Sequence, residues 1–380
     1  MRIGFDASRI TTPQRTGTEN YSFYLARALA EVDKSNEYIL YFRDRLGSES
    51  FAEISLGNPA FRPRALPWPR LWTQGRLAWE CLQHPPDILF IPAHTVPVIR
   101  RPSLRTVVTI HDLGFEYLPE YHQFPQKLYL DKMTKYAARC ASRLIAVSKA
   151  TKADLIRQFN VPERKITVVY EGVDREKFLP SRQVAGEATK TKNVRKKYGI
   201  KGPYILFVGT VQPRKNLRRL IEAFSRIADR TLGLVIAGRP GWMFDDIYSA
   251  PRDFGVADRV LFLGHVPERD LPPLYGGAVC LCLPSLYEGF GLPILEAMAS
   301  GVPVVTANVS SLPEVGGEAA VYVDPYDVGS IACGLGEILG SYGTPLYEGW
   351  VRRGFDQVAK FTWERCARET LQVFNAVAGT

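Results

Sequence analysis

The sequence predicts an α/β protein of two domains, each built on a parallel β-sheet that carries helices on both faces. The chain has 380 residues, which is too long for one comfortable hydrophobic core. Short runs rich in Val, Ile, Leu and Phe alternate with stretches of helical periodicity, as successive βα units require. A polar, basic stretch at residues 181–202 interrupts this alternation, which then starts again. We interpret that stretch as a linker, overlapped by a short helix.

The first half of the chain supplies the strands and helices of an N-terminal domain, expected over residues 1–180. Its apolar runs do not alternate with polar residues, which is typical of parallel strands buried on both faces. Helical spacing is clearest at 19–32 and 126–140. The expected strands are residues 2–6, 38–42, 88–91, 106–110, 144–147 and 166–169.

The second half repeats this architecture without repeating the sequence, and it predicts a C-terminal domain over residues 203–360. Helices are expected at 217–227 and 293–299. The final segment, 361–380, reads as a helix that packs back on the N-terminal domain. The expected strands are residues 204–208, 234–237, 260–263, 279–283, 302–306 and 320–323.

Composition narrows the class of partner. Hydrophobic residues make up 46% and charged residues 23%, as in ordinary globular domains. The net charge of +9 suits an anionic partner: nucleic acid, a nucleotide or an acidic membrane surface. The chain has no nucleic-acid motif, so no nucleic-acid partner is expected. It has no apolar leader and no run of about 18 apolar residues, which predicts a cytoplasmic protein.

The most informative motif is PSLYEGFGLPILEAMASG at 284–301, where a strand ends, a glycine-bearing turn follows and a helix begins near Pro293. Gly289 and Gly291 let the backbone approach a ligand, and the helix start favours an anion such as a diphosphate. Glu288 and Glu296 flank this start and suit the hydroxyls of a nucleotide sugar. A carboxylate near a helix start is also common for electrostatic reasons alone.

A second motif, GTVQPRKN at 209–216, directly follows the expected strand 204–208. Arg214 provides a planar fork of donors and Lys215 a point charge, which together suit a diphosphate leaving group. Ligands of doubly wound sheets bind beyond the carboxyl ends of the strands. Both motifs are therefore expected at one edge of the second sheet.

These motifs, with LPEVGG at 312–317, FTWERCA at 361–367, IHDLGFEYLPEYH at 110–122 and RLIAVSKATKADLIRQF at 143–159, resemble glycosyltransferase family 4. The resemblance covers nearly the whole chain. It implies the GT-B fold, with two facing Rossmann-like domains and an interdomain cleft. It also implies a retaining hexosyltransferase that uses a nucleotide-sugar donor.

Residue by residue, the resemblance implies that Arg214 and Lys215 neutralise the donor diphosphate. It also implies that Glu288 lies beside the transferred sugar, that Glu296 holds the ribose hydroxyls and that His111 reaches the sugar from the N-terminal domain. Backbone groups would line the phosphates and sugar at Gly289, Phe290, Gly291 and Leu292.

The first loop departs from the family pattern, in which a double glycine meets the donor phosphates. Here the loop reads TPQRTGTEN at 12–20, so only Gly17 is available for that contact. Arg15 is the residue that could compensate.

No D-x-D sequence occurs, so we expect a metal-independent reaction with no cofactor beyond the donor. The segment 110–122 is most similar to mannosyltransferases that use GDP-mannose in building bacterial surface polysaccharide. A glycan or lipid-linked glycan is the expected acceptor, with peripheral contact to an anionic inner-membrane face. The sequence leaves a UDP-hexose or UDP-N-acetylhexosamine as an alternative donor. The alternatives from other classes are a nucleotide-sugar epimerase and a non-enzymatic nucleotide-binding module.

Overall fold

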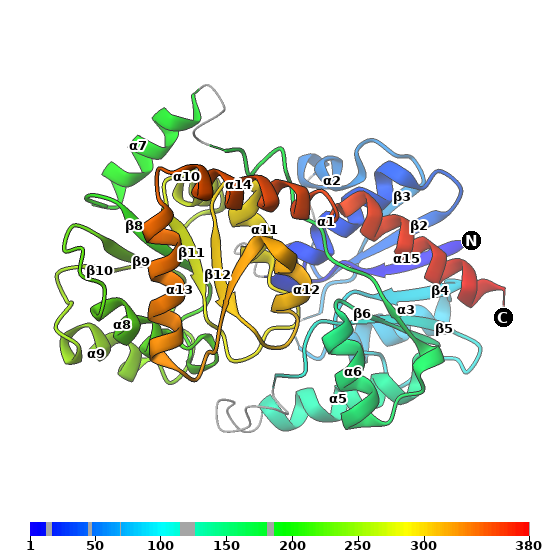
Figure 1. Cartoon of the computed structure of the whole chain (residues 1–380). Helices are drawn as coiled ribbons and strands as arrows, with labels where there is room; N and C mark the ends of the chain where they lie inside the picture. Colours follow the sequence, from blue (N-terminus) through cyan, green and yellow to red (C-terminus); the bar gives the residue numbers. More distant parts are fainter. Residues whose placement is uncertain (13–16, 45–47, 69, 115–125, 181–185, 380) are drawn as a thin grey trace. The chain divides into compact units, whose positions relative to one another are not determined.

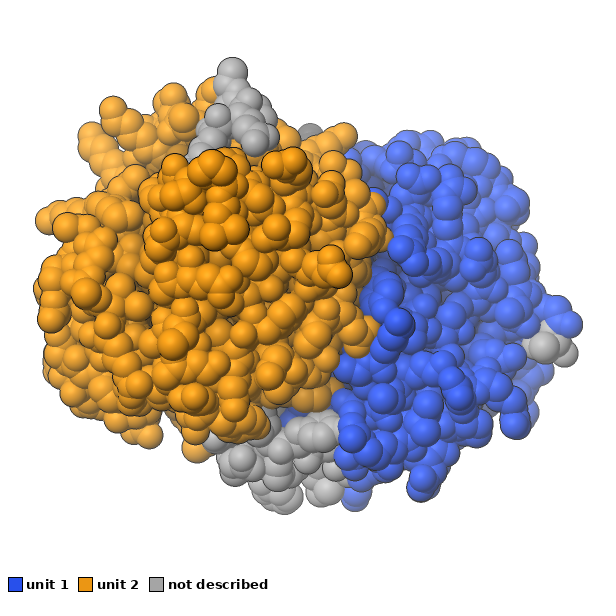
Figure 2. Space-filling model, in the orientation of Figure 1, with its two compact units in different colours: residues 1–116, 122–172, 362–380 blue, residues 117–121, 173–361 orange. Residues whose placement is uncertain are grey.

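A computed structural model describes residues 1–12, 17–44, 48–68, 70–114, 126–180 and 186–379, and Figure 1 shows its helices and strands. The chain divides into two compact units, coloured separately in Figure 2. Unit 1 holds the described residues up to Gly172 together with 362–379, and unit 2 holds Val173–Phe361. No helix in the described ranges is long and apolar enough to span a bilayer.

Unit 1 is built on a seven-stranded parallel sheet in the order β3-β2-β1-β4-β5-β6-β7. Six of these strands match the apolar runs of the sequence, and their side chains are largely buried. The seventh, β3, was not expected from the sequence. Its sequence FRPRA carries two arginines and a proline, which an edge strand tolerates because one side of its backbone is unpaired. The strands are β1 (Arg2–Asp6), β2 (Glu37–Phe42), β3 (Phe61–Ala65), β4 (Ile88–Ile91), β5 (Arg105–Ile110), β6 (Arg143–Ala146) and β7 (Ile166–Val168).

Helices cover the sheet of unit 1, and the last helix of the chain is among them (Figure 1). Thr362 caps this helix, α15, by accepting a hydrogen bond from the Arg365 backbone N–H. The Trp363 ring stacks on Tyr24 of α1 at 5.4 Å between centroids. The helices are α1 (Gly17–Val32), α2 (Ser48–Ser55), α3 (Ala78–Gln83), α5 (Gln126–Cys140), α6 (Lys149–Phe159) and α15 (Trp363–Ala378), with a π-helical turn η1 (Thr73–Leu77).

Unit 2 has a six-stranded parallel sheet in the order β10-β9-β8-β11-β12-β13. The first strand in sequence, β8, lies in the middle, and the chain proceeds outward to one side and then to the other. That is the strand order of the doubly wound dinucleotide-binding fold. All six expected strands are present, as β8 (Tyr204–Val208), β9 (Gly233–Ala237), β10 (Val260–Gly264), β11 (Cys280–Leu283), β12 (Val304–Ala307) and β13 (Ala320–Val323).

The helices of unit 2 include α7, which lies inside the stretch interpreted as a linker and packs on α10. Three further short helices matter for the site, because they begin where strands end: the 3-10 turn η4 (Pro213–Lys215), α11 and α12. The α-helices are α7 (Glu187–Lys197), α8 (Leu217–Ser225), α9 (Asp245–Asp253), α10 (Leu271–Gly276), α11 (Leu292–Ala299), α12 (Leu312–Gly316), α13 (Val328–Ser341) and α14 (Pro345–Val358).

Candidate active site

The two motifs of the second half meet at the carboxyl edge of the unit 2 sheet. β8 and β11 are neighbours, and β8 is the strand at which the order of connections reverses. A doubly wound sheet binds its ligands beyond this point because the flanking loops diverge there. The loop after β8 also lies against the loop after β9, since a Cβ on Gly238 would fall 1.8 Å from the Gly209 carbonyl oxygen.

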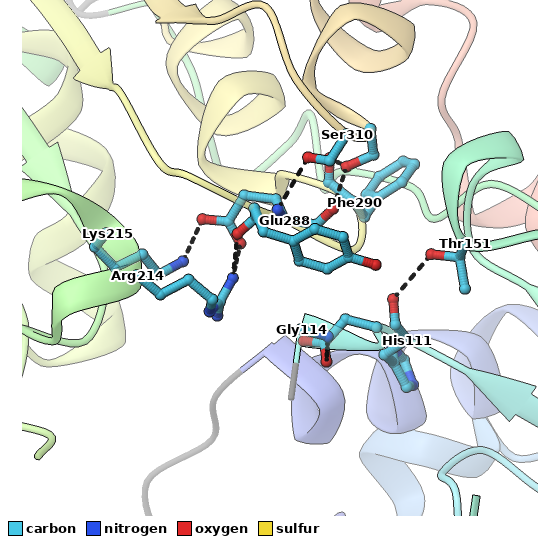
Figure 3. A network of polar contacts seen from close by, with 11 residues as sticks. His111, Gly114, Thr151, Arg214, Lys215, Glu288, Phe290 and Ser310 are labelled. Atoms are coloured by element: carbon cyan, nitrogen blue, oxygen red, sulfur yellow. Dashed lines mark hydrogen bonds and ion pairs between the residues drawn. The ribbon is translucent and has the colours of Figure 1, made fainter. Parts of the chain in front are cut away.

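Arg214 and Lys215 converge on Glu288 (Figure 3). The Arg214 Nη1 donates to Glu288 Oε2 at 3.0 Å, and Lys215 Nζ donates to Glu288 Oε1 at 2.5 Å. Arg214 also donates to the Tyr287 carbonyl oxygen. The three charged side chains are only 9–13% exposed. The structure therefore brings together two cations and one carboxylate, with a net charge of +1 at a largely buried position.

The pKa of Glu288 reflects a competition between burial and charge. Burial raises the pKa of this carboxyl. The charges of Lys215 and Arg214, with the hydrogen bond from Lys215, outweigh burial and lower the pKa to about 2. The carboxylate is therefore ionised near pH 7, where it can act as a hydrogen-bond acceptor and a counter-ion.

Two serines that the sequence analysis did not single out hold the backbone of the Glu288 turn. The Glu288 N–H donates to Ser310 Oγ at 3.0 Å (Figure 3). Ser311 Oγ donates to the carbonyl oxygens of Glu288 and Phe290, at 2.9 and 2.7 Å. Both serines follow β12, the next strand of the sheet. Polar residues directly after an adjacent apolar strand were the signal that could have identified them.

The turn ends in a helix start whose geometry requires glycine. Gly291 has a φ of +114°, which side-chain-bearing residues rarely adopt, and it precedes α11. Leu292 is the first residue of that helix and Pro293 the second. The helix dipole gives this end a partial positive charge, which favours an anion.

Glu296 lies one turn into α11 and has a different partner. The Tyr275 hydroxyl donates to Glu296 Oε2 at 2.6 Å. Burial raises the pKa of Glu296, with the hydrogen bond from Tyr275 and the charge of Lys177 acting against it. Lys177 is itself paired with Glu268. Unit 2 therefore contains a second polar cluster. It is centred on Glu296 of α11, the helix that begins directly after the Glu288 turn.

His111 follows β5 in unit 1, and both of its ring nitrogens have partners there. Nδ1 lies 3.1 Å from Glu171 Oε1, and Nε2 lies 2.8 Å from the Pro92 carbonyl oxygen. The Tyr21 ring meets the imidazole edge-on at 4.7 Å between centroids. Thr151 Oγ1 donates to the His111 carbonyl oxygen at 3.3 Å (Figure 3). Glu171 was not identified from the sequence, although it too directly follows a β-strand region.

A second histidine, His94, supports the same loop of unit 1. The His111 backbone N–H donates to His94 Nε2 at 3.3 Å, which requires a lone pair on that nitrogen. Burial and the neighbouring His111 lower the pKa of His94 to about 4. His94 is consequently neutral near pH 7.

Of the first-loop residues predicted to meet the donor phosphates, only Gly17 lies within the described residues. Gly17 is exposed and is the first residue of α1, and among the described residues no atom beyond its chain neighbours and its own helix lies within 4 Å of a Cβ built on it. Packing against the described residues therefore does not require glycine here. Arg15 lies outside the described residues.

Comparison with known proteins gives matches along the whole chain. Residues 15–177 match the family model described as Glycosyltransferase Family 4, and residues 190–355 match the one described as Glycosyl transferases group 1. The O-antigen chain mannosyltransferase B of Escherichia coli is 32% identical to this chain, across 98% of this chain and 99% of that protein. The O-antigen chain mannosyltransferase RfbU of Salmonella typhimurium is 30% identical, across 62% of this chain and 60% of that protein.

Solved structures share the fold at low sequence identity. Sucrose-phosphate synthase from Thermosynechococcus elongatus aligns with a TM-score of 0.75 at 20% identity, covering 99% of each chain. Anabaena HepE, solved in complex with UDP-glucose, aligns with a TM-score of 0.73 at 17% identity, covering 99% of this chain and 100% of that one.

Two parallel Rossmann-like sheets in one chain, together with structural neighbours aligned over 99% of it, show the GT-B fold. This confirms the fold class that the sequence predicts. The match to a full-length relative at 32% identity, together with both family models, identifies the family. The chain belongs to glycosyltransferase family 4 and is an enzyme of the hexosyltransferase class.

Proposed function

We propose that this enzyme transfers mannose from GDP-mannose to a glycan or lipid-linked glycan during the synthesis of a surface polysaccharide. The observation that carries the proposal is the cluster of Arg214, Lys215 and Glu288 at the switch point of the unit 2 sheet. The choice of mannose is supported by relatives named as O-antigen mannosyltransferases, one of which aligns over 99% of its length. Nucleotide-sugar binding is supported by the neighbour solved with UDP-glucose.

The cluster suits the charge separation of glycosyl transfer. As the bond between sugar and phosphate breaks, negative charge grows on the diphosphate and positive charge on the sugar ring. Arg214 and Lys215 are fixed cations, and the start of α11 adds a partial positive charge. The Glu288 carboxylate accepts hydrogen bonds from sugar hydroxyls and stabilises the positive ring. The cations are already held in place by Glu288, so little reorganisation is needed when charge develops.

Retention of anomeric configuration and metal independence are parts of the same proposal. Glu288 is ionised and engaged by two cations, which makes it a weak nucleophile. We therefore assign no covalent intermediate and propose a same-face displacement in which the leaving phosphate accepts the acceptor's proton. The anomeric proton signal of the product, read by NMR, tests retention. An inverted product would contradict it.

A thermal-shift panel of GDP, UDP, ADP, dTDP and their common sugars tests the donor. A selective upward shift with GDP and GDP-mannose is expected, because a ligand that binds only the folded state stabilises it. A selective shift with UDP-sugars would favour the UDP-hexose or UDP-N-acetylhexosamine alternative.

The matched variants are Lys215→Met, which removes one cation, and Glu318→Gln, an exposed glutamate elsewhere in unit 2. Each shift is measured against the variant's own melting temperature. Lys215→Met should lose most of the shift, and Glu318→Gln should keep it. Absence of any shift in folded wild-type protein would count against a nucleotide-sugar donor.

A further inference from the structure

Asn216 ends the basic motif after β8 in a backbone conformation that few residues adopt. Its φ is +60° and its ψ is +29°, which is the left-handed region. Glycine is the usual residue there, although asparagine tolerates the region better than most residues with a side chain. An asparagine directly before a helix commonly caps it, but the Asn216 side chain makes no such bond to α8. Asn216 is only 4% exposed, so its amide needs other partners inside the fold.

The amide of Asn216 joins three loops at the carboxyl edge of the unit 2 sheet. Its Nδ2 donates to the Pro284 carbonyl oxygen at 3.0 Å and to the Pro325 carbonyl oxygen at 2.6 Å. Pro284 directly follows β11, and Pro325 follows the end of β13. In the sheet, β11 is the neighbour of β8, whereas β11 and β12 both lie between β8 and β13. One side chain therefore links the loop after β8 to two other loops of the same sheet edge.

An arginine orients this amide. Arg219 Nη1 donates to Asn216 Oδ1 at 3.0 Å. Because two carbonyl oxygens face one side of the amide and an arginine donor faces the other, its nitrogen and its oxygen are each fixed in place. The Arg219 guanidinium also lies 5.8 Å from the centroid of the Tyr326 ring. Donor and acceptor atoms of the amide are thus both used within unit 2, and an aspartate of the same shape would lack the donor.

These bonds hold the two cations of the site through their backbone. Asn216 directly follows Arg214 and Lys215, so its amide attaches their turn to the loop after β11. A second attachment is the Leu286 backbone N–H, which donates to the Arg214 carbonyl oxygen at 2.9 Å. The loop that receives both attachments continues to Glu288, where the two cations meet the carboxylate (Figure 3). Asn216 therefore helps to set where the backbone of each cation lies relative to Glu288.

We propose that Asn216 is a positioning residue for glycosyl transfer, which holds the turn of Arg214 and Lys215 in place without touching the donor. This role rests on the proposed function, which assigns the donor diphosphate to these two cations. When the bond between sugar and phosphate breaks, its electron pair stays on the phosphate oxygen, and the diphosphate gains one negative charge. A displaced cation consequently loses more stabilisation of the departing diphosphate than of the intact donor.

Asn216→Gly tests this role, because glycine keeps the left-handed backbone and removes the three side-chain hydrogen bonds. The readout is the pair of dissociation constants for GDP and GDP-mannose, measured by calorimetry. Free GDP carries the additional charge of the departing diphosphate, whereas GDP-mannose does not. The affinity for GDP should fall about tenfold and that for GDP-mannose less than about threefold. With transfer followed as GDP release, kcat should fall about tenfold or more, and the donor KM should change less than about threefold.

The matched control is Asn160→Gly. Asn160 ends α6 of unit 1 in the same backbone conformation, with a φ of +50°, and it is exposed. This variant makes the same chemical change outside the unit 2 sheet and should leave both dissociation constants within twofold. Arg219→Met keeps the amide and removes only the donor that orients it, so it should show the same selective loss at a smaller size. It supplies the test if the thermal midpoint shows that Asn216→Gly does not fold.

A purely structural role for Asn216 predicts a different result. A lower melting temperature with equal weakening of both ligands, or with no weakening, would overturn the positioning role while wild-type binding stays intact. If folded wild type binds neither GDP nor UDP compounds, the proposed function and the positioning role both fail. If it binds UDP and UDP-glucose instead, the GDP-mannose assignment is wrong. The ratio of dissociation constants for that pair, in the wild type and Asn216→Gly, then decides the role of Asn216.

Discussion

Replacing Glu288 with glutamine should weaken the protein by an amount that depends on pH. Glutamine keeps the side-chain volume and one acceptor oxygen but leaves Arg214 and Lys215 without a counter-charge at positions 13% and 11% exposed. Removing one partner of a buried ion pair typically costs about 3–5 kcal/mol. We expect unit 2 of Glu288→Gln to lose about 3 kcal/mol of unfolding free energy at pH 7.

The pH dependence follows from the depressed pKa of this carboxyl. A carboxyl whose pKa is about 2 in the folded protein, against an ordinary value of 4.5, stabilises the fold fully above pH 4.5. That stabilisation is lost as pH falls through 4.5 toward 2. Between pH 7 and pH 3.5 the wild type should lose about 1.4 kcal/mol from this one group, and Glu288→Gln should lose none of it. The free-energy difference between the two proteins should therefore shrink by about half.

The assay is urea unfolding at pH 7 and pH 3.5, followed by pulsed hydrogen exchange on peptides from β11 and α11. Peptide-level detection is needed because the two units can unfold separately. Glu318→Gln is the control and should follow the wild type at both pH values. Equal pH slopes for wild type and Glu288→Gln would refute the ion-pair reasoning. Transfer by Glu288→Gln should fall about 10²- to 10³-fold, as expected when a group that stabilises the transition state is lost.

Three further predictions concern the same site. A chelator should leave the initial rate of transfer within twofold of its starting value, and a loss that added metal reverses would disprove metal independence. Gly291→Ala should cost about 1–2 kcal/mol in unfolding free energy, because φ is +114° and the new Cβ would lie 3.1 Å from Leu312 Cδ2. Gly336→Ala, in open space on α13, should be neutral or stabilising, and similar costs for both would exclude backbone strain as the cause. Tyr275→Phe, which frees Glu296, should raise the donor KM more than it lowers kcat, and a pure kcat loss would contradict that assignment.

Most of the sheet architecture could be predicted because parallel strands buried on both faces leave a strong signature in sequence. β11, with the sequence CLCL, is fully buried and could be recognised as an apolar run. β3, with FRPRA, could not, because an edge strand exposed on one side needs no apolar run. Its pairing with β2 is set by backbone hydrogen bonds, which the sequence does not display.

The residues of the candidate site likewise fall into those that the sequence predicts and those that it does not. Arg214, Lys215 and Glu288 lie in motifs that directly follow strands, so their meeting at one sheet edge could be expected. Ser310 and Ser311 were missed because serine is common in loops, and only the fold shows that they bond to the backbone of a turn some 22 residues earlier. The sequence could not reveal that the side chains predicted to contact the ligand also contact each other.

That mutual contact explains how a buried cationic site can exist in a stable protein. Two cations at 11–13% exposure would be costly alone, and Glu288 compensates them while leaving a net charge of +1. A fully neutral cluster would have less attraction for a diphosphate, and an uncompensated one would destabilise unit 2. The partial positive charge at the start of α11 adds to the remaining charge without requiring another buried side chain. Under the proposed function, the cluster is a compromise in which Glu288 compensates the two cations that would bind the donor and would itself accept hydrogen bonds from the transferred sugar.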